Sequence, residues 1–300
     1  MTDGGPSGAP GLAVPRGQSW RADVLLAAQS LARPVPEAQG GATSDLSVDE
    51  VLLLHSIGWE PVDLVFGSSV ASTPPAAWGW GQGEIVVASE SWDIAFRGAL
   101  HRLVGECARV DGFGVVGVQI DTEIERLHTD VELVGTAVRP IAKAGQKVAQ
   151  QLGRPFASDL SARDYALLVQ TGWRPVGLAF GASFVNVPRR SVSTTISQKG
   201  QNVELTNFTE AMYTAREAAM SRLQDSAVSM DAGGIVDVSI SEGPMVFARH
   251  AIGFTAWGTA IVPGPEGHRH LEPKMVLPLD DLQVTFQATA LRQQGGEVES

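Results

Sequence analysis

The chain of 300 residues contains the same passage twice, and this duplication constrains its fold more than any other feature. Residues 46–67 read LSVDEVLLLHSIGWEPVDLVFG, and residues 160–181, 114 positions later, read LSARDYALLVQTGWRPVGLAFG. Two more blocks recur at slightly larger shifts, residues 111–120 at 120 positions and residues 135–137 at 123 positions. Since insertions are tolerated best in surface loops, we expect the matched blocks to be core elements and the added residues to lie in loops. Each repeat is long enough for a core of its own.

Composition narrows the class of protein and of partner. With 44% hydrophobic and 18% charged residues, the chain has the composition of a globular protein. Its net charge of -11 argues against nucleic acid or an anionic membrane as partner, since both are bound through clustered Lys and Arg. The basic pair Arg189-Arg190 is too small to reverse this balance.

Cysteine usage and the start of the chain indicate the compartment. The single cysteine, Cys107, excludes an internal disulfide and fits a reducing compartment, and its place on a helix face favours packing over reactivity. No apolar run approaches the roughly 20 residues of a membrane span. The first residues lack the basic start and apolar stretch of a secretory signal, so we expect a cytoplasmic protein.

The repeats and their composition divide the chain into six predicted parts. These are a disordered tail (1–19), a lead-in helix and linker (20–43), a first domain (44–140), a linker helix (141–157), a second domain (158–263) and an extension (264–300) with a possible edge strand at 282–291. The amphipathic stripe of residues 20–32 either docks on its own domain or binds a protein partner, and the pattern does not distinguish the two.

Within each repeat the local signals follow one order. A capping pattern, Ser47 with Glu50 or Ser161 with Asp164, begins a short helix that a glycine ends. The patterns then predict strands at 62–70 and 176–187, a short strand at 84–88, long helices from Trp92 to Val110 and from Met212 to Ala227, and hairpins of 115–120 with 131–138 and of 235–240 with 252–262. This order predicts an α+β fold in which one long helix covers a small, mainly antiparallel sheet. Such a sheet leaves exposed edges that invite another subunit.

Two variable loops supply candidate interface or ligand residues. The loop 71–83 carries Trp78 and Trp80, which either line a ligand or interface or fold onto their own domain. The corresponding loop of the second repeat carries Arg189 and Arg190. Because these loops differ between the repeats, they would give the two domains different partners.

Metal and catalytic signals are sparse. Glu123, Glu125, His128 and Asp130 gather at the tip of the first predicted hairpin, but the second repeat does not keep them, and we favour a solvated turn. His268 and His270 are a second candidate metal pair, for which a solvated loop is the favoured interpretation. No nucleophile elbow, HExxH motif or duplicated carboxylate pair is present, so no residue is assigned a catalytic role and no cofactor is expected.

The repeated blocks resemble a known family. The Gly-Trp-x-Pro-Val turns at 58 and 172, the alanine-rich helices, the strands from Gly114 and Gly234, and the closing Gly-Thr-Ala at 135 and 258 resemble the YbjQ-like family, often labelled a heavy-metal-binding domain. The resemblance implies two tandem domains with a dodecin-like fold, which assembles as pentameric rings in single-domain relatives. For a two-domain chain it implies a homo-oligomer, with five chains forming two stacked rings.

Two classes of function remain open at this stage. The first is a non-enzymatic assembly or ligand-binding protein whose function lies in repeated surfaces. The second is a metal or small-molecule sensor, or an enzyme that uses one degenerate copy, which would have a localised pocket with convergent polar groups in one domain.

Overall fold

The computed structural model describes residues 43–79, 81–142, 155–188, 205–245 and 247–264. The first repeat contains α2 (Val48–Ser56), β1 (Trp59–Ser72), the 3-10 helix η1 (Pro75–Trp78), β2 (Gly83–Glu84), α3 (Val86–Arg109), β3 (Gly114–Ile124) and β4 (His128–Pro140). The second repeat contains β5 (Phe156–Ala157), α5 (Ala162–Gln170), β6 (Trp173–Asn186), α7 (Thr206–Val228), β7 (Gly234–Met245) and β8 (Ala248–Pro263). The α+β class is therefore confirmed, and both repeats follow the predicted order.

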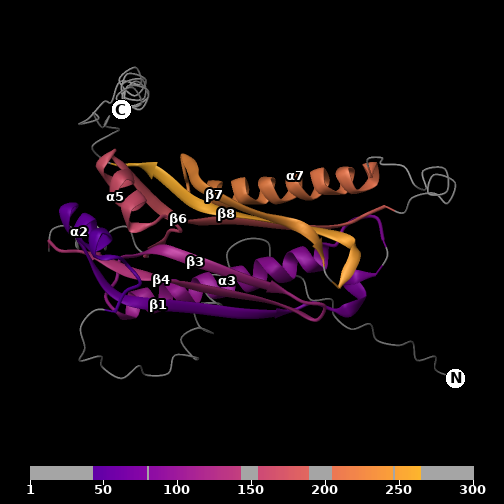
Figure 1. The fold of residues 1–300 in the computed structure, drawn as a ribbon, viewed down its shortest axis with the longest axis horizontal. Helices are drawn as coiled ribbons and strands as arrows, with labels where there is room; N and C mark the ends of the chain where they lie inside the picture. The colour runs from indigo at the N-terminus through magenta and orange to yellow at the C-terminus, as the bar shows by residue number, and fades with distance from the viewer. Residues whose placement is uncertain (1–42, 80, 143–154, 189–204, 246, 265–300) are drawn as a thin grey trace, which may run out of the picture.

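The strands form two four-stranded sheets that exchange short strands. The strand order is β1-β4-β3-β5 in the first sheet and β2-β6-β8-β7 in the second. The short β2 belongs to the first repeat but pairs with β6, and β5 opens the second repeat but pairs with β3. In Figure 1, α7 lies along the second sheet on the side away from the first sheet. Each sheet is thus completed by residues of the other repeat.

The two short helices begin and end where the sequence predicts. The amide of Ser47 donates to the Glu50 carboxylate at 2.9 Å, and the amide of Asp164 donates to the Ser161 hydroxyl at 3.1 Å, so both N-termini are capped. At the other ends, Gly58 and Gly172 have φ angles of 78° and 82°. This left-handed conformation is strained for residues with a Cβ, which explains glycine at both positions.

The predicted strand at 84–88 is wrong. In this segment the strand β2 ends at Glu84, and α3 begins at Val86 rather than at the predicted Trp92. The amides of Ala88 and Ser89 both donate to the Ile85 carbonyl, which closes the first helical turn. Valine favours strands, but here tertiary packing overrides that preference, since Ala88 and Ser89 are buried in the helix.

The long helices approach their own sheets closely through matched glycines. A Cβ at Gly67 of β1 would overlap the backbone of Ala99 and Leu103 in α3. A Cβ at Gly181 of β6 would overlap Ala219 and Leu223 in α7 in the same way. Because no side chain separates helix from strand here, each long helix lies close against its own sheet.

The hydrophobic core joins the repeats. Its largest cluster contains Trp92 and Phe96 of α3 together with Phe180 and Phe184 of β6. A second cluster lies between α7 and the second sheet, and a third gathers α2, α5 and the residues between β5 and α5. The helix α3 therefore packs on both sheets, whereas α7 packs on the second sheet.

Three predicted segments are not tested by this structure. The lead-in helix at 20–32, most of the linker helix at 141–157 and the edge strand at 282–291 lie outside the described residues. Among the helices that the structure describes, none has the length and apolarity of a membrane span.

Candidate functional site

The most elaborate feature of the described chain is the contact between its two repeats. The ring of Phe180 stacks on Phe96 with centroids 4.3 Å apart and lies 6.1 Å from the ring of Trp92. The guanidinium of Arg97 lies 5.0 Å from the Phe180 ring centroid, within cation–π distance. All three aromatic side chains are at most 4% exposed. The face of β6 that α7 does not cover is thus covered by α3.

The residues before α3 extend this contact along the edge of β6. Gly83 and Glu84 pair with Asn186 and Val185, and the amide of Ile85 donates to the Phe184 carbonyl at 2.6 Å. These bonds satisfy an edge that would otherwise be open. The first repeat therefore docks on the second through backbone as well as side chains.

Glu84 fixes this short strand through charge. Its carboxylate accepts two hydrogen bonds from Arg222 of α7, at 2.5 and 2.9 Å, and others from the hydroxyls of Ser89 and Ser183. Burial alone would raise the pKa of Glu84, but the hydrogen bonds from Arg222 and Ser89 outweigh it and hold the pKa below its ordinary value. Glu84 therefore stays ionised and bridges the repeats at neutral pH.

In a second set of backbone hydrogen bonds, the start of the second repeat pairs with the first sheet. The amide of Ser158 donates to the Val115 carbonyl at 2.9 Å, and the amides of Val118 and Gly117 donate to the carbonyls of Ser158 and Leu160 at 3.0 and 2.8 Å. Here the start of the second repeat follows β3 of the first. Since the two sets use different elements of each repeat, the contact is head-to-tail.

Trp78 lies at this contact. Its side chain is 5% exposed and packs edge-on against Phe184 and Phe247 of the second repeat. Its indole N–H donates to the Arg126 carbonyl at 3.1 Å, and its own carbonyl lies 2.9 Å from His250 Nε2. Trp78 therefore contacts its own repeat through Arg126 and the second repeat through Phe184 and Phe247. Trp80, Arg189 and Arg190 lie outside the described residues.

The equivalent face of the first sheet is open. Leu64, Phe66 and Val70 of β1 are 40%, 45% and 66% exposed, whereas their counterparts 114 positions later, Leu178, Phe180 and Phe184, are at most 4% exposed. This difference exists because α3 covers β6, while no described element covers this face of β1. The open face is the candidate functional surface.

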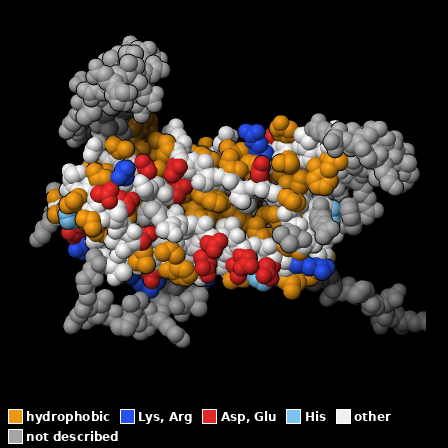
Figure 2. Space-filling view, in the orientation of Figure 1, with side chains coloured by type: hydrophobic (Ala, Val, Ile, Leu, Met, Phe, Trp, Pro, Cys, Tyr) orange, Lys and Arg blue, Asp and Glu red, His pale blue; other side chains and the backbone are white. Residues whose placement is uncertain are grey.

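The candidate metal residues at 123–130, for which a solvated turn is the favoured interpretation, lie on the hairpin of β3 and β4. His128 Nε2 lies 3.6 Å from a Glu125 carboxylate oxygen and 3.7 Å from one of Asp130. Figure 2 shows acidic side chains gathered over β3 and β4, where Glu123 faces Asp130 in the strand register. Within the described ranges no three His, Cys, Asp or Glu side chains are placed to hold a metal ion. His268 and His270 lie outside these ranges.

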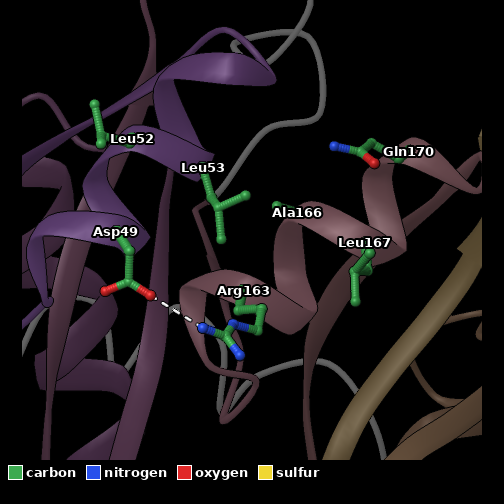
Figure 3. A pocket seen from close by; sticks show the side chains of 7 residues that line it. All are labelled: Asp49, Leu52, Leu53, Arg163, Ala166, Leu167 and Gln170. Carbon is green, nitrogen blue, oxygen red and sulfur yellow. Dashed lines mark hydrogen bonds and ion pairs between the residues drawn. The ribbon is translucent and has the colours of Figure 1, made fainter. Parts of the chain in front are cut away.

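A shallow groove of about 540 Å³ lies between the two short helices. Figure 3 shows Leu52 and Leu53 on α2 and Leu167 on α5, with Arg163 reaching across to Asp49. The Arg163–Asp49 distance is 3.0 Å, and both side chains are at least 60% exposed. Three of its seven lining residues, Asp49, Arg163 and Gln170, are polar, and the first two are paired with each other.

Cys107 packs as the sequence indicates. Its side chain is buried, its Sγ lies 3.4 Å from the Gly114 carbonyl, and burial raises the pKa of the thiol to about 12. A thiol that stays protonated is a poor nucleophile. Cys107 is therefore a packing residue.

Sequence reasoning missed a duplicated polar pair. Thr136 donates to Asp45 and Thr259 donates to Asp159, each at 2.5 Å. Asp159 is the more enclosed carboxylate, and burial, with a smaller contribution from Asp237, raises its pKa to about 6. The signal was present, because both acids match at a shift of 114 and both threonines at 123. In each repeat the pair ties the segment before the short helix to the sheet.

Comparisons with known proteins give one family match and one relative. The YbjQ-like family model, described as "Putative heavy-metal-binding", matches residues 192–263, within the second repeat. The chain is also 34% identical over 247 residues to a protein named "Encapsulin nanocompartment protein Rv1762c" from Mycobacterium tuberculosis, a match that covers 81% of this chain and 94% of that protein. Residues 192–263 thus belong to the YbjQ-like family, as the sequence motifs indicate, and the chain as a whole belongs to the same family as this mycobacterial relative.

Proposed function

We propose that this chain is a non-enzymatic protein that assembles with copies of itself and works as a component of an encapsulin nanocompartment. The observation that carries the proposal is the open β1 face, on which Leu64, Phe66 and Val70 are exposed although the matching face of β6 is fully covered. Exposed apolar patches on a folded protein mark surfaces that bind other proteins. The name of the mycobacterial relative supports the nanocompartment.

The same proposal includes the architecture of two tandem YbjQ-like, dodecin-like domains. Both repeats place a short capped helix, a long strand, a long helix and a hairpin in the same order, with matched glycines at the helix-to-strand contacts. A homo-oligomer in the cytoplasm, pentameric in chains, is the expected assembly. In this architecture the first domain spans residues 44–140 and the second spans residues 158–263.

Native mass spectrometry of untagged protein tests self-assembly. We expect a discrete multiple of the 31.6 kDa chain without a bound metal. A species of one chain at micromolar concentration would contradict self-assembly. Stoichiometric zinc or copper would favour the metal-binding alternative instead.

A second experiment tests the nanocompartment. The encapsulin shell is purified from the native host by density and size, and the protein is quantified in the shell fraction by mass spectrometry. We expect it to co-purify with intact shells and to stay with them through a second density step. Recovery only in the fraction of free protein would refute this part of the proposal.

A further inference from the structure

We infer that the open β1 face of one chain receives the α7 face of a second copy, in the geometry that α3 and β6 already show within one chain. The inference rests on the proposed self-assembly and specifies which surfaces carry it. The within-chain contact is head-to-tail, since it uses α3 of the first repeat and the β6 face of the second repeat. It leaves unused the β1 face of the first repeat and the α7 face of the second repeat.

The acceptor surface is the β1 face. Phe66 occupies the position of Phe180, and Val70 that of Phe184, both of which lie beneath α3 within the chain. Apolar side chains that are 45% and 66% exposed in the single chain would be covered by an equivalent helix. Covering apolar area of this kind favours association.

The donor surface is the corresponding face of α7. Met212 stands 120 positions after Trp92, and Arg216 stands 120 after Phe96. Met212 is 38% exposed, whereas Trp92 is fully buried by the contact within the chain. A thioether and a guanidinium both pack well on an aromatic ring, so Met212 and Arg216 suit Phe66.

The arginines of the two long helices make matching contacts with their own strands. Arg102 donates to the Ser68 carbonyl at 2.8 Å, just as Arg222 donates to the Ala182 carbonyl at 2.6 Å. Arg222 also binds Glu84, but in the described part of the chain no carboxylate pairs with Arg102.

The remaining sheet edge fits the same contact. Within the chain, β3 receives the segment around Ser158, while β7 is the outer strand of its sheet, with Val238 and Ile240 41% and 51% exposed. The segment that corresponds to Ser158 in the first repeat is Ser44 with its neighbours. In one head-to-tail contact, one copy thus contributes its β1 face and the segment around Ser44. The other copy contributes α7 and β7.

This contact has a consequence for the ring. A head-to-tail contact closes into a ring if its rotation allows and otherwise extends as a filament. First and second repeats would alternate around such a ring, so every ring holds an even number of repeats. Five chains would then form one alternating ring rather than two stacked rings.

Two variants and their mixture test the inference. Phe66→Glu disables the acceptor face, Met212→Glu disables the donor face, and Ile94→Glu, at an exposed position of α3, is the control. We expect each of the first two variants to run as a single chain of 31.6 kDa in light scattering, with an unchanged circular dichroism spectrum, while the control assembles normally. An equimolar mixture of Phe66→Glu and Met212→Glu retains one intact pair of surfaces, so it should form a species of two chains and nothing larger.

The outcomes separate this inference from the proposed function. A wild-type protein that is itself a single chain refutes self-assembly, and with it this contact. A wild-type oligomer that survives Phe66→Glu or Met212→Glu leaves self-assembly standing but overturns the contact. Unchanged mass with a large loss of thermal stability in Phe66→Glu means that the chain covers this face itself, which also overturns it. If Phe66→Glu does not fold, Val70→Glu, at a more exposed position of the same face, takes its place in both comparisons.

Discussion

Replacing Asp159 with asparagine should stabilise the folded chain near neutral pH. The pKa of Asp159 is raised from 3.8 to about 6, first by burial and further by Asp237. One pKa unit corresponds to about 1.4 kcal/mol, so the ionised carboxylate lowers the free energy of unfolding by up to about 3 kcal/mol at pH 7.5. The asparagine side chain keeps an oxygen that can accept the bond from Thr259, which is 2.5 Å long in the wild type, and it carries no charge.

The sign of the pH dependence follows from linkage. An acid whose pKa is raised by folding binds more protons in the folded state between pH 3.8 and 6, so wild-type stability from this group falls as pH rises through that window. The asparagine variant lacks this group. Its advantage should therefore be about 2 to 3 kcal/mol at pH 7.5 and below about 1 kcal/mol at pH 4.

Urea unfolding at several pH values, at one fixed protein concentration, measures this difference, because association also contributes to apparent stability. Asp45→Asn is the matched control, since Asp45 accepts the same bond from Thr136 at 2.5 Å but is exposed to water. An advantage for Asp159→Asn that stays constant from pH 4 to 7.5, or a loss of stability at pH 7.5, would refute the reasoning.

Three further predictions concern packing, backbone and charge. Gly67→Ala should lower the free energy of unfolding by about 1 to 3 kcal/mol or more, because its Cβ meets the backbone of α3, whereas Gly105→Ala in open space should be neutral or stabilising by up to about 1 kcal/mol; chemical denaturation of both variants checks this. Asp237→Gly should stabilise by about 1 kcal/mol, since Asp237 has a φ of 55° where the first repeat has Gly117 at 63°, and an unchanged or lower melting temperature would contradict it. Glu84→Gln should cost about 1 kcal/mol after allowance for solvent screening, while Asp93→Asn, which loses an exposed ion pair, should change little; the two denaturation midpoints give the comparison.

The local architecture was predictable because its signals are local. Ser47 with Glu50 and the glycines at 58 and 172 act within one helical turn, so the sequence alone locates both ends of the short helices. The alternation of residues 115–120 likewise identifies β3 without knowledge of its neighbours.

The contact between repeats was not predictable from such signals. Val86 and Val87 favour a strand by themselves, and only the packing of Ala88 and Ser89 beside β6 makes this segment the start of α3. The exchanged strands β2 and β5 have two residues each, too short for any periodicity. The burial of Phe180 and the exposure of Phe66 cannot be predicted from two passages that both place phenylalanine there, since the difference lies in what packs on each.

The exchange of β2 and β5 has a consequence for synthesis of the chain. The first sheet gains β5 only after residues 156–157 have left the ribosome, and β2 finds its partner β6 only after residue 186 has done so. Trp92 likewise lacks its contact with Phe180 until the second repeat has been synthesised. The nascent first repeat must therefore keep its aromatic helix from other chains until the second repeat emerges, so a ribosome that stalls between the repeats would release an aggregation-prone product.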